Sequence, residues 1–370
     1  MDPEKAKILF EQGAIFLLID FPEGSEFGID YHSWHAGPKF NGIKMIPPGI
    51  HYLYYSSTSK ENVSGPRSGF FYHFEAQQIV VTKWDKTLEE IHFESISHDE
   101  LQRYHCNKEN MDSFLGPYPY EKYKQWVSLS SHITKDLVDI LKPDVGIIYS
   151  LDQFESEAST TQSRQEEAIK NTEQSMEVDA CKKHKLPKLK SLQGTNIKYS
   201  TIPKKKYPDG ATPGLISKYS MDSSYVLELV LTERFKGSIE HLLGEIQFAF
   251  VCFLIGQNYD SFEQWKKLVH LLCTSSDAIL KYPKAYMDFI TILHFQIREI
   301  PSDFFVNIVT SRNFLTDTLH ELFQNFLTDN VDPELKKKGL NFQKHLTKKF
   351  NWDFSIEPDE YAPVVVDLQM

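Results

Sequence analysis

The hydrophobic positions change their spacing near residue 97, which divides the chain into a strand-rich part and a helix-rich part. Before that point, short runs of β-branched and aromatic residues are bounded by Gly, Pro, Asn and Ser, as is typical of strands and turns. We predict strands at 13–20, 49–56, 69–75 and 78–84. The last two are separated by a two-residue loop and are predicted to form a hairpin. The pattern indicates a small antiparallel sandwich or barrel.

Sequence signals typical of helices occur both before and after this strand-rich part. At the N-terminus, Asp2 is suited to cap a short helix, Pro3 to occupy its first position and Gly13 to end it. From about residue 97 the apolar period lengthens, and three helical segments follow before Pro143. We therefore expect an N-terminal β-rich domain at 1–150, with helices at its C-terminal end.

The second half of the chain, from about 213 to 350, has a helical pattern throughout. The segment "SIEHLLGEIQFAFVCFLIG" is apolar on most faces, which predicts a central buried helix. The next helix is predicted to open with a capping box at Ser261 and Gln264. A later helix is predicted to start with Asp332 as cap and Pro333 in the first position. The sequence thus predicts an α+β protein whose second domain, 208–355, is an all-α bundle.

Between the two parts, at 151–207, the composition departs from that of a folded domain. Residues 152–180 hold eight acids against two bases and a single aromatic residue, so they cannot bury enough apolar area to offset the cost of ordering. We interpret the segment as a disordered charged linker. Nine lysines and no acid follow between residues 182 and 206. Such lysines are a solvated tail, a nuclear-import signal or an RNA contact. The candidate import cluster is Lys182, Lys183, Lys185, Lys188 and Lys190.

Overall composition narrows the class of protein. The net charge of −11 argues against nucleic-acid binding through a global positive field, and we do not expect direct RNA contact. The four cysteines form no CxxC pair, which favours a reducing compartment. The longest apolar run, 248–255, is about half of what a bilayer crossing needs. We expect a monomer in the cytoplasm and nucleus, without a membrane.

Candidate chemistry is sparse. No P-loop, GxGxxG, GxSxG or HExxH motif occurs. His32 and His35, with Asp30 or His51, suggest a metal site, and a metal-dependent hydrolase is one alternative function. Residues three apart in a strand point to opposite faces, however, so we interpret these histidines as surface residues.

Two histidine–cysteine pairs also resemble nucleophile pairs. His105 and Cys106 are adjacent on a predicted helix and should diverge. His270 and Cys273 share a face of a hydrophobic helix, where cysteine is usually a small core residue. We therefore predict no catalytic residue, no cofactor and no metal.

The chain ends on an acidic, proline-containing run followed by "APVVVDL", an apolar strand-forming tail at 356–370. An unpaired strand edge invites another edge, so this strand pairs with a partner's sheet or folds back onto its own protein. The residues of the candidate partner-binding strand are Pro363, Val364, Val365, Val366, Asp367 and Leu368.

Six segments, in order, resemble the AAR-two family, the A-one-cistron splicing factors. They are "EFGIDYHSWHAGPKFNGIKMIPPGIHYLYYSS", "FLGPYPYEKYKQWVSLS", "PDGATPGLISKYSMDSSYVLE", "LGEIQFAFVCFLIGQNYDSFEQWKKLVHLLC", "EIPSDFFVNIVT" and "FQKHLTKKFNWDF". The resemblance covers almost the whole chain and lapses only at about 150–195.

This resemblance implies a non-enzymatic spliceosome assembly factor with an N-terminal β-rich domain and a C-terminal VHS-like helical domain. It implies binding to the large U5 snRNP scaffold protein (processing factor eight), at its RNase H-like and Jab/MPN-like domains, in competition with the U5 RNA helicase. It also implies that the tail strand bridges those two scaffold domains. An RNA chaperone acting through the lysine-rich linker is a second alternative.

Overall fold

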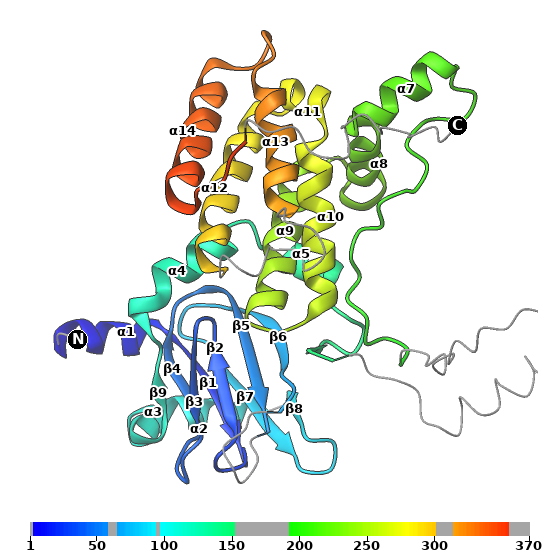
Figure 1. The fold of residues 1–370 in the computed structure, drawn as a ribbon. Coiled ribbons are helices and arrows are strands. Elements are labelled where there is room, and N and C mark those ends of the chain that lie inside the picture. The colour runs from blue at the N-terminus through cyan, green and yellow to red at the C-terminus, as the bar shows by residue number, and fades with distance from the viewer. Residues whose placement is uncertain (1–2, 58–64, 94–96, 152–191, 301–313, 355–370) are drawn as a thin grey trace, which may run out of the picture. The chain divides into compact units, whose positions relative to one another are not determined.

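The computed structural model describes residues 3–57, 65–93, 97–151, 192–300 and 314–354 (Figure 1). Its contacts divide the chain into two compact units. Unit 1 comprises Met1–Ile29, Ser33–Gly116 and Ile140–Lys198, and unit 2 comprises Asp30–His32, Pro117–Asp139 and Tyr199–Met370.

Unit 1 is built on two five-stranded sheets, in the orders β8-β7-β1-β4-β9 and β10-β6-β5-β2-β3. The strands of the first sheet are β1 (Ala14–Ile19), β4 (Gly42–Ile46), β7 (Ile79–Asp85), β8 (Glu90–Phe93) and β9 (Gly116–Pro117). Those of the second are β2 (Glu26–Ile29), β3 (His32–His35), β5 (Gly49–Ser56), β6 (Ser68–Phe74) and β10 (Ile148–Tyr149).

Aromatic side chains fill the space between the two sheets. Phe16 of β1 stacks on Phe27 of β2 with ring centroids 5.8 Å apart, and Tyr55 of β5 meets the edge of Trp84 of β7 at 5.4 Å. Large rings that join two layers bury much apolar area for each residue. The predicted β-rich sandwich is therefore confirmed.

The predicted hairpin at 69–75 and 78–84 is wrong. β6 pairs with β5 and β10 in one sheet, whereas β7 pairs with β1 and β8 in the other, so the short loop carries the chain from one layer to the next. β1 and β7 moreover run parallel, so this sheet is mixed, in contrast to the antiparallel arrangement that the sequence suggested. Strand length and alternation do not specify which layer a strand joins.

Helices flank the sheets of unit 1. They are α1 (Pro3–Gln12), α2 (His98–Cys106), α3 (Lys108–Met111) and the 3-10 turn η1 (Asp112–Phe114). Pro3 begins α1 and Gly13 follows its end, as predicted, while Asp2 lies outside the described residues. A side chain on Gly13 would lie 2.7 Å from the Cα of Met45, so only glycine allows the chain to turn so close to β4.

All regular elements in the described part of unit 2 after residue 199 are helices (Figure 1). They are α7 (Pro213–Met221), α8 (Ser224–Phe235), α9 (Ile239–Leu254), α10 (Tyr259–Cys273), α11 (Ser276–Lys281), α12 (Pro283–Glu299), α13 (Phe314–Phe326) and α14 (Pro333–Phe350). Helix α4 (Tyr120–Ser130) also belongs to this unit, and α5 (Lys135–Leu141) crosses its boundary.

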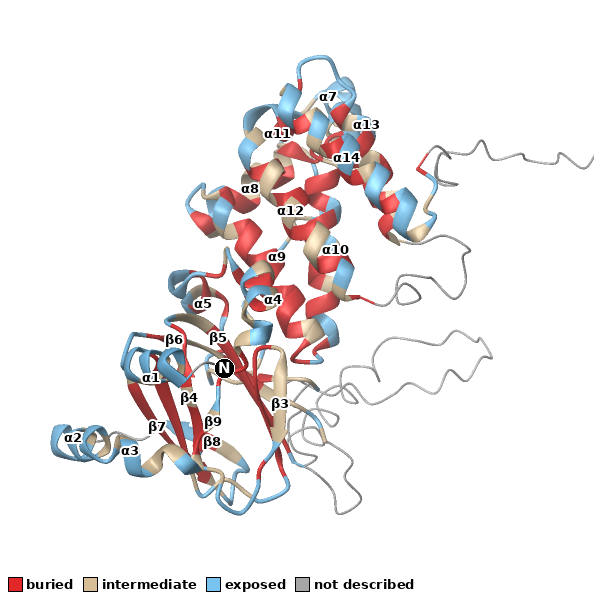
Figure 2. Ribbon diagram, turned by 90° about the vertical axis from the view of Figure 1, so that its left-hand side faces the viewer, coloured by how far each residue is buried: buried red, intermediate tan, exposed pale blue. Residues whose placement is uncertain are grey.

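Helix α9 is the central buried helix, as predicted, and Figure 2 shows it buried along most of its length. Its Gly244 lies against the segment between α4 and α5, where a Cβ would fall 2.4 Å from the carbonyl oxygen of His132. This close approach explains why residues 117–139 group with the helical unit, although the sequence analysis counted them with the N-terminal domain.

The helix starts show one confirmed and one wrong prediction. Asp332 caps α14 by accepting hydrogen bonds from the amides of Glu334 and Leu335, as expected. The predicted capping box at Ser261 and Gln264 is wrong, because Asn258 is the N-cap of α10 and accepts from the Ser261 amide. Both predicted capping residues instead face the core.

The segment 152–191 lies outside the described residues, but the chain on both of its sides is anchored to unit 1. On one side β10 pairs with β6, and Val145 donates its amide to the carbonyl of Gly194 across the segment. On the other side Lys198 donates its amide to Leu141 at 2.8 Å. The expected inter-domain linker therefore leaves and re-enters the same unit.

No single helix in the described ranges is long and apolar enough to span a membrane; α8 and α9 reach the required length and hydropathy only as a pair bent by 88°.

Candidate functional site

The two sets of residues that the sequence proposed as sites lie outside the described part of the chain. They are the tail strand Pro363–Leu368 and the lysines from Lys182 to Lys190. Both therefore stay predictions. The described residues offer a cleft on unit 1 and a buried polar cluster in unit 2.

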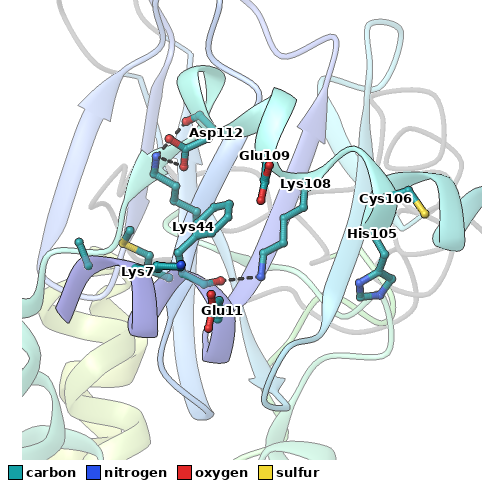
Figure 3. A pocket seen from close by; sticks show the side chains of 11 residues that line it. Lys7, Glu11, Lys44, His105, Cys106, Lys108, Glu109 and Asp112 are labelled. Carbon is teal, nitrogen blue, oxygen red and sulfur yellow. Dashed lines mark hydrogen bonds and ion pairs between the residues drawn. The ribbon is translucent and has the colours of Figure 1, made fainter. Parts of the chain in front are cut away.

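The cleft has a volume of about 520 Å³ and lies between α1, β4 and the segment from α2 to η1 (Figure 3). Its charged lining consists of the lysines Lys7, Lys44 and Lys108 and the acids Glu11, Glu109 and Asp112. Three positive and three negative groups leave it without a net charge that would select an ion of one sign.

The ring of Phe10 from α1 lies under two ammonium groups in this cleft. The Nζ atoms of Lys108 and Lys44 are 4.6 and 5.8 Å from the ring centroid, distances at which a cation is attracted to an aromatic face. Lys44 also forms an ion pair with Asp112 at 2.5 Å, and Lys108 donates to the carbonyl oxygen of Phe10 in the last turn of α1. These contacts hold α1, which has no fully buried residue, against the sheet.

Partial burial lowers the pKa of Lys108, while the nearby charge of Glu11 acts in the opposite direction. His105 and Cys106 line the same cleft, but their side chains point in different directions (Figure 3). They therefore form no nucleophile–base pair, as the sequence predicted from their adjacency.

The other histidines and cysteines that the sequence suggested do not come together as a catalytic or metal-binding site among the described residues. His51 is buried, and its Nε2 lies 2.9 Å from the carbonyl oxygen of Pro47, whereas His35 at the end of β3 is exposed. Among the described residues, no group of three His, Cys, Asp or Glu side chains is arranged to hold a metal ion. Burial raises the pKa of the Cys273 thiol well above its ordinary value, which opposes formation of a nucleophilic thiolate.

The polar cluster in unit 2 centres on Glu245 of α9, which is fully buried. Its Oε1 accepts hydrogen bonds from the amide of Ser200 at 2.9 Å, the Oγ of Ser200 at 3.0 Å and the Nε2 of Gln264 at 3.0 Å. Next to it, the hydroxyl of Tyr199 donates to the Oγ of Ser261 at 2.7 Å. The cluster thus fixes residues 199–200 to α9 and α10 at the point where the chain enters unit 2.

Burial raises the pKa of Glu245, and the hydrogen bonds from Ser200 and Gln264 oppose that shift. Glu245 was not predicted from the sequence as a site residue. The available signal was a carboxylate inside a largely apolar helix, because a buried carboxylate needs donors. Those donors all reach Oε1, and Oε2 has no hydrogen-bond partner among the described residues. The hydrogen bonds of the cluster anchor the backbone of Ser200 to α9 and α10.

Comparison with known proteins places both halves of the chain in one family. Residues 12–143 match the family model "AAR2 N-terminal domain", and residues 199–355 match "AAR2 C-terminal repeat region". The stretch between these matches, residues 144–198, contains the acidic residues 152–180 and six of the nine lysines.

Named relatives match over nearly their full length. "Protein AAR2 homolog" of Homo sapiens is 44% identical over 375 residues, which cover 100% of this chain and 97% of that protein. "Protein AAR2 homolog" of Caenorhabditis elegans is 37% identical, with 96% and 99% covered. "A1 cistron-splicing factor AAR2" of Saccharomyces cerevisiae is 25% identical, with 92% and 94% covered.

Proposed function

This chain belongs to the AAR2 family, and from that membership we propose that it is a non-catalytic splicing factor that assists assembly of the U5 snRNP. It binds the large U5 scaffold protein at the RNase H-like and Jab/MPN-like domains and holds off the U5 RNA helicase until maturation is complete. The observation that carries this proposal is the match to both AAR2 domain models together with the splicing-factor name of the yeast relative.

The described residues support action by occupancy rather than by chemistry. The cleft on unit 1 has balanced charge, its histidine and cysteine do not face each other, and the buried cysteines of unit 2 are disfavoured as thiolates. A protein of this kind acts by covering a surface that a competitor also needs.

In the proposed complex, Val364, Val365 and Val366 add a strand to a sheet edge of the scaffold, with backbone hydrogen bonds giving affinity. Full burial of three valines contributes about 1.5–3 kcal/mol each. Ordering a segment of this length costs about 1–2 kcal/mol for each residue, so the two contributions nearly cancel. The folded units must therefore dock as well, which raises the effective concentration of the tail at the partner edge.

The protein works as a monomer without a cofactor and passes between cytoplasm and nucleus. The cluster at Lys182, Lys183, Lys185, Lys188 and Lys190 serves nuclear import. Substitution of these lysines by glutamine should reduce nuclear accumulation while leaving affinity for the scaffold unchanged.

The decisive experiment measures affinity of the full chain for the RNase H-like and Jab/MPN-like pair. Deletion of residues 361–370 should weaken binding by at least about tenfold, without changing thermal unfolding of the two units. Val365→Pro, which removes a backbone donor, should weaken binding similarly, whereas Val365→Thr retains the donor and the β-branched shape and serves as the matched control. Unchanged affinity after the deletion would refute the role of the tail.

A further inference from the structure

The outer face of α13 and α14 combines an apolar hollow with a row of lysines. The hollow, of about 80 Å³, has the buried rings of Phe323 and Phe326 as its floor. Gly339 of α14 allows the close packing beneath it, since a Cβ there would lie 2.5 Å from the Phe326 ring. On the rim, Leu327 is 60% exposed and Leu340 is 43% exposed. The hollow matches one branched apolar side chain in size.

Lysines follow this rim along α14. Residues 335–352 contain six lysines and no acid. Four of them, Lys337, Lys344, Lys348 and Lys349, are exposed. Lys337, Lys344 and Lys348 are spaced by seven and four residues, so these three lie on one face of the helix beside Leu340. At a rise of about 1.5 Å per residue, they extend over about 16 Å.

These three lysines differ from Lys218 and Lys281 of the same unit. Lys218 and Lys281 form ion pairs with Asp277 and Glu228 at 3.1 and 2.7 Å. No carboxylate among the described residues lies within ion-pair distance of Lys337, Lys344 or Lys348. A local excess of positive charge therefore stands next to an unfilled apolar hollow, in a chain whose net charge is −11.

We propose that this face of α13 and α14 binds an acidic, leucine-rich segment of a partner protein. One apolar side chain of that segment enters the hollow above Phe323 and Phe326, and its carboxylates pair with the lysine row. This proposal names a second binding surface and goes beyond the proposed function.

The apolar lining of the hollow favours a protein ligand over a nucleic acid. A phosphate backbone would satisfy the lysines but would leave Leu327 and Leu340 exposed. The two rings that line the hollow are 6% and 3% exposed, so they offer no face for base stacking. An acidic amphipathic segment satisfies both the charge and the apolar area at once.

The test measures fluorescence anisotropy of the full chain with a labelled peptide that repeats Leu-Glu-Glu-Leu. Companion peptides carry Gln for Glu or Ser for Leu, and a labelled oligo-uridine RNA is the competing class of ligand. The triple variant Lys337→Glu, Lys344→Glu and Lys348→Glu should lose about tenfold or more in affinity for the first peptide. Leu340→Ser should also lose affinity, by several fold, because it removes apolar area from the rim.

The matched control reverses three other exposed lysines of unit 2, namely Lys124, Lys267 and Lys284, and should bind the peptide like the unmodified protein. All substitutions are at exposed positions, so unchanged thermal unfolding should accompany them. Failure of the unmodified chain to bind the peptide, or equal binding by both triple variants, overturns the proposal. Binding of the RNA that depends on the lysine row but not on Leu340 also overturns it, in favour of a nucleic-acid surface.

Discussion

Replacing Glu245 by alanine removes the oxygen on which three buried donors converge. The backbone amide of Ser200 has no conformational freedom to find another acceptor, whereas the Oγ of Ser200 can rotate. Gln264 keeps its second hydrogen bond, from Nε2 to the carbonyl oxygen of Ser200 at 2.9 Å. A buried donor left without a partner costs about 1–3 kcal/mol. With loss of the side-chain packing, we expect Glu245→Ala to lower the free energy of unfolding of unit 2 by about 2–4 kcal/mol.

Glu245→Gln is the matched control, because its amide oxygen can still accept from Ser200 and its volume is unchanged. It should cost less than about 1 kcal/mol near neutral pH, since it also removes a buried charge. The pH dependence of stability separates the effect of the hydrogen bonds from the effect of removing the buried charge. The folded pKa of Glu245 is raised, so the native state binds the extra proton, and stability is lost as pH rises from the unfolded pKa through the folded pKa. The stability of Glu245→Gln relative to that of the unmodified chain should therefore rise as pH rises through that window, because glutamine does not titrate.

Hydrogen exchange followed by mass spectrometry is the suitable assay, because it reports on residues 199–201 separately from unit 1. Glu245→Ala should accelerate exchange at this segment, and Glu245→Gln should leave it close to that of the unmodified protein. Urea unfolding followed by the helical circular dichroism signal gives the accompanying free energy. Equal exchange in Glu245→Ala and the unmodified chain would refute the anchoring role of the cluster.

Two further predictions concern Lys108 and His294. Lys108→Met should accelerate hydrogen exchange in α1, because it removes the donor to the Phe10 carbonyl and the cation over the Phe10 ring, and unchanged exchange would contradict this account of how α1 is held. Burial, followed by nearby cationic side chains, lowers the pKa of His294, so the unfolded state binds more protons and stability falls as pH drops below the unfolded value of about 6.5. His294→Asn should reduce this acid sensitivity in thermal unfolding measured between neutral and mildly acidic pH, and an identical pH profile would show that His294 does not contribute.

Sequence patterns predicted the positions of helices and strands more reliably than they predicted which strands pair. The apolar character of the α9 segment and the Asp332–Pro333 start of α14 are local signals, and both predictions were confirmed. The pairing of β6 and β7 failed because a two-residue loop fits a hairpin and a crossing between layers equally well. Ser261 was misread as a cap because the actual cap, Asn258, lies only three residues earlier and also suits that role.

The sites depend on contacts that are distant in sequence. Glu245 meets Ser200 across 45 positions and the cleft joins α1 to residues about one hundred positions later, so no periodicity could reveal either. The lysine row of α14 is visible in the sequence, but the apolar hollow beside it arises only when Gly339 packs against Phe326. The family resemblance, in contrast, was readable from the sequence because ordered blocks retain identity over the whole chain.

The return of the chain to unit 1 has a practical consequence for reporter design. Val145 and Gly194 are hydrogen-bonded to each other, so the length of polypeptide between them does not set the reach from one unit to the other. A fluorescent protein could therefore replace part of 152–191 without straining unit 1, because both ends of the insertion would be held by this hydrogen bond. Such an insertion would leave unchanged the five places where the chain passes between the units, at residues 29–30, 32–33, 116–117, 139–140 and 198–199.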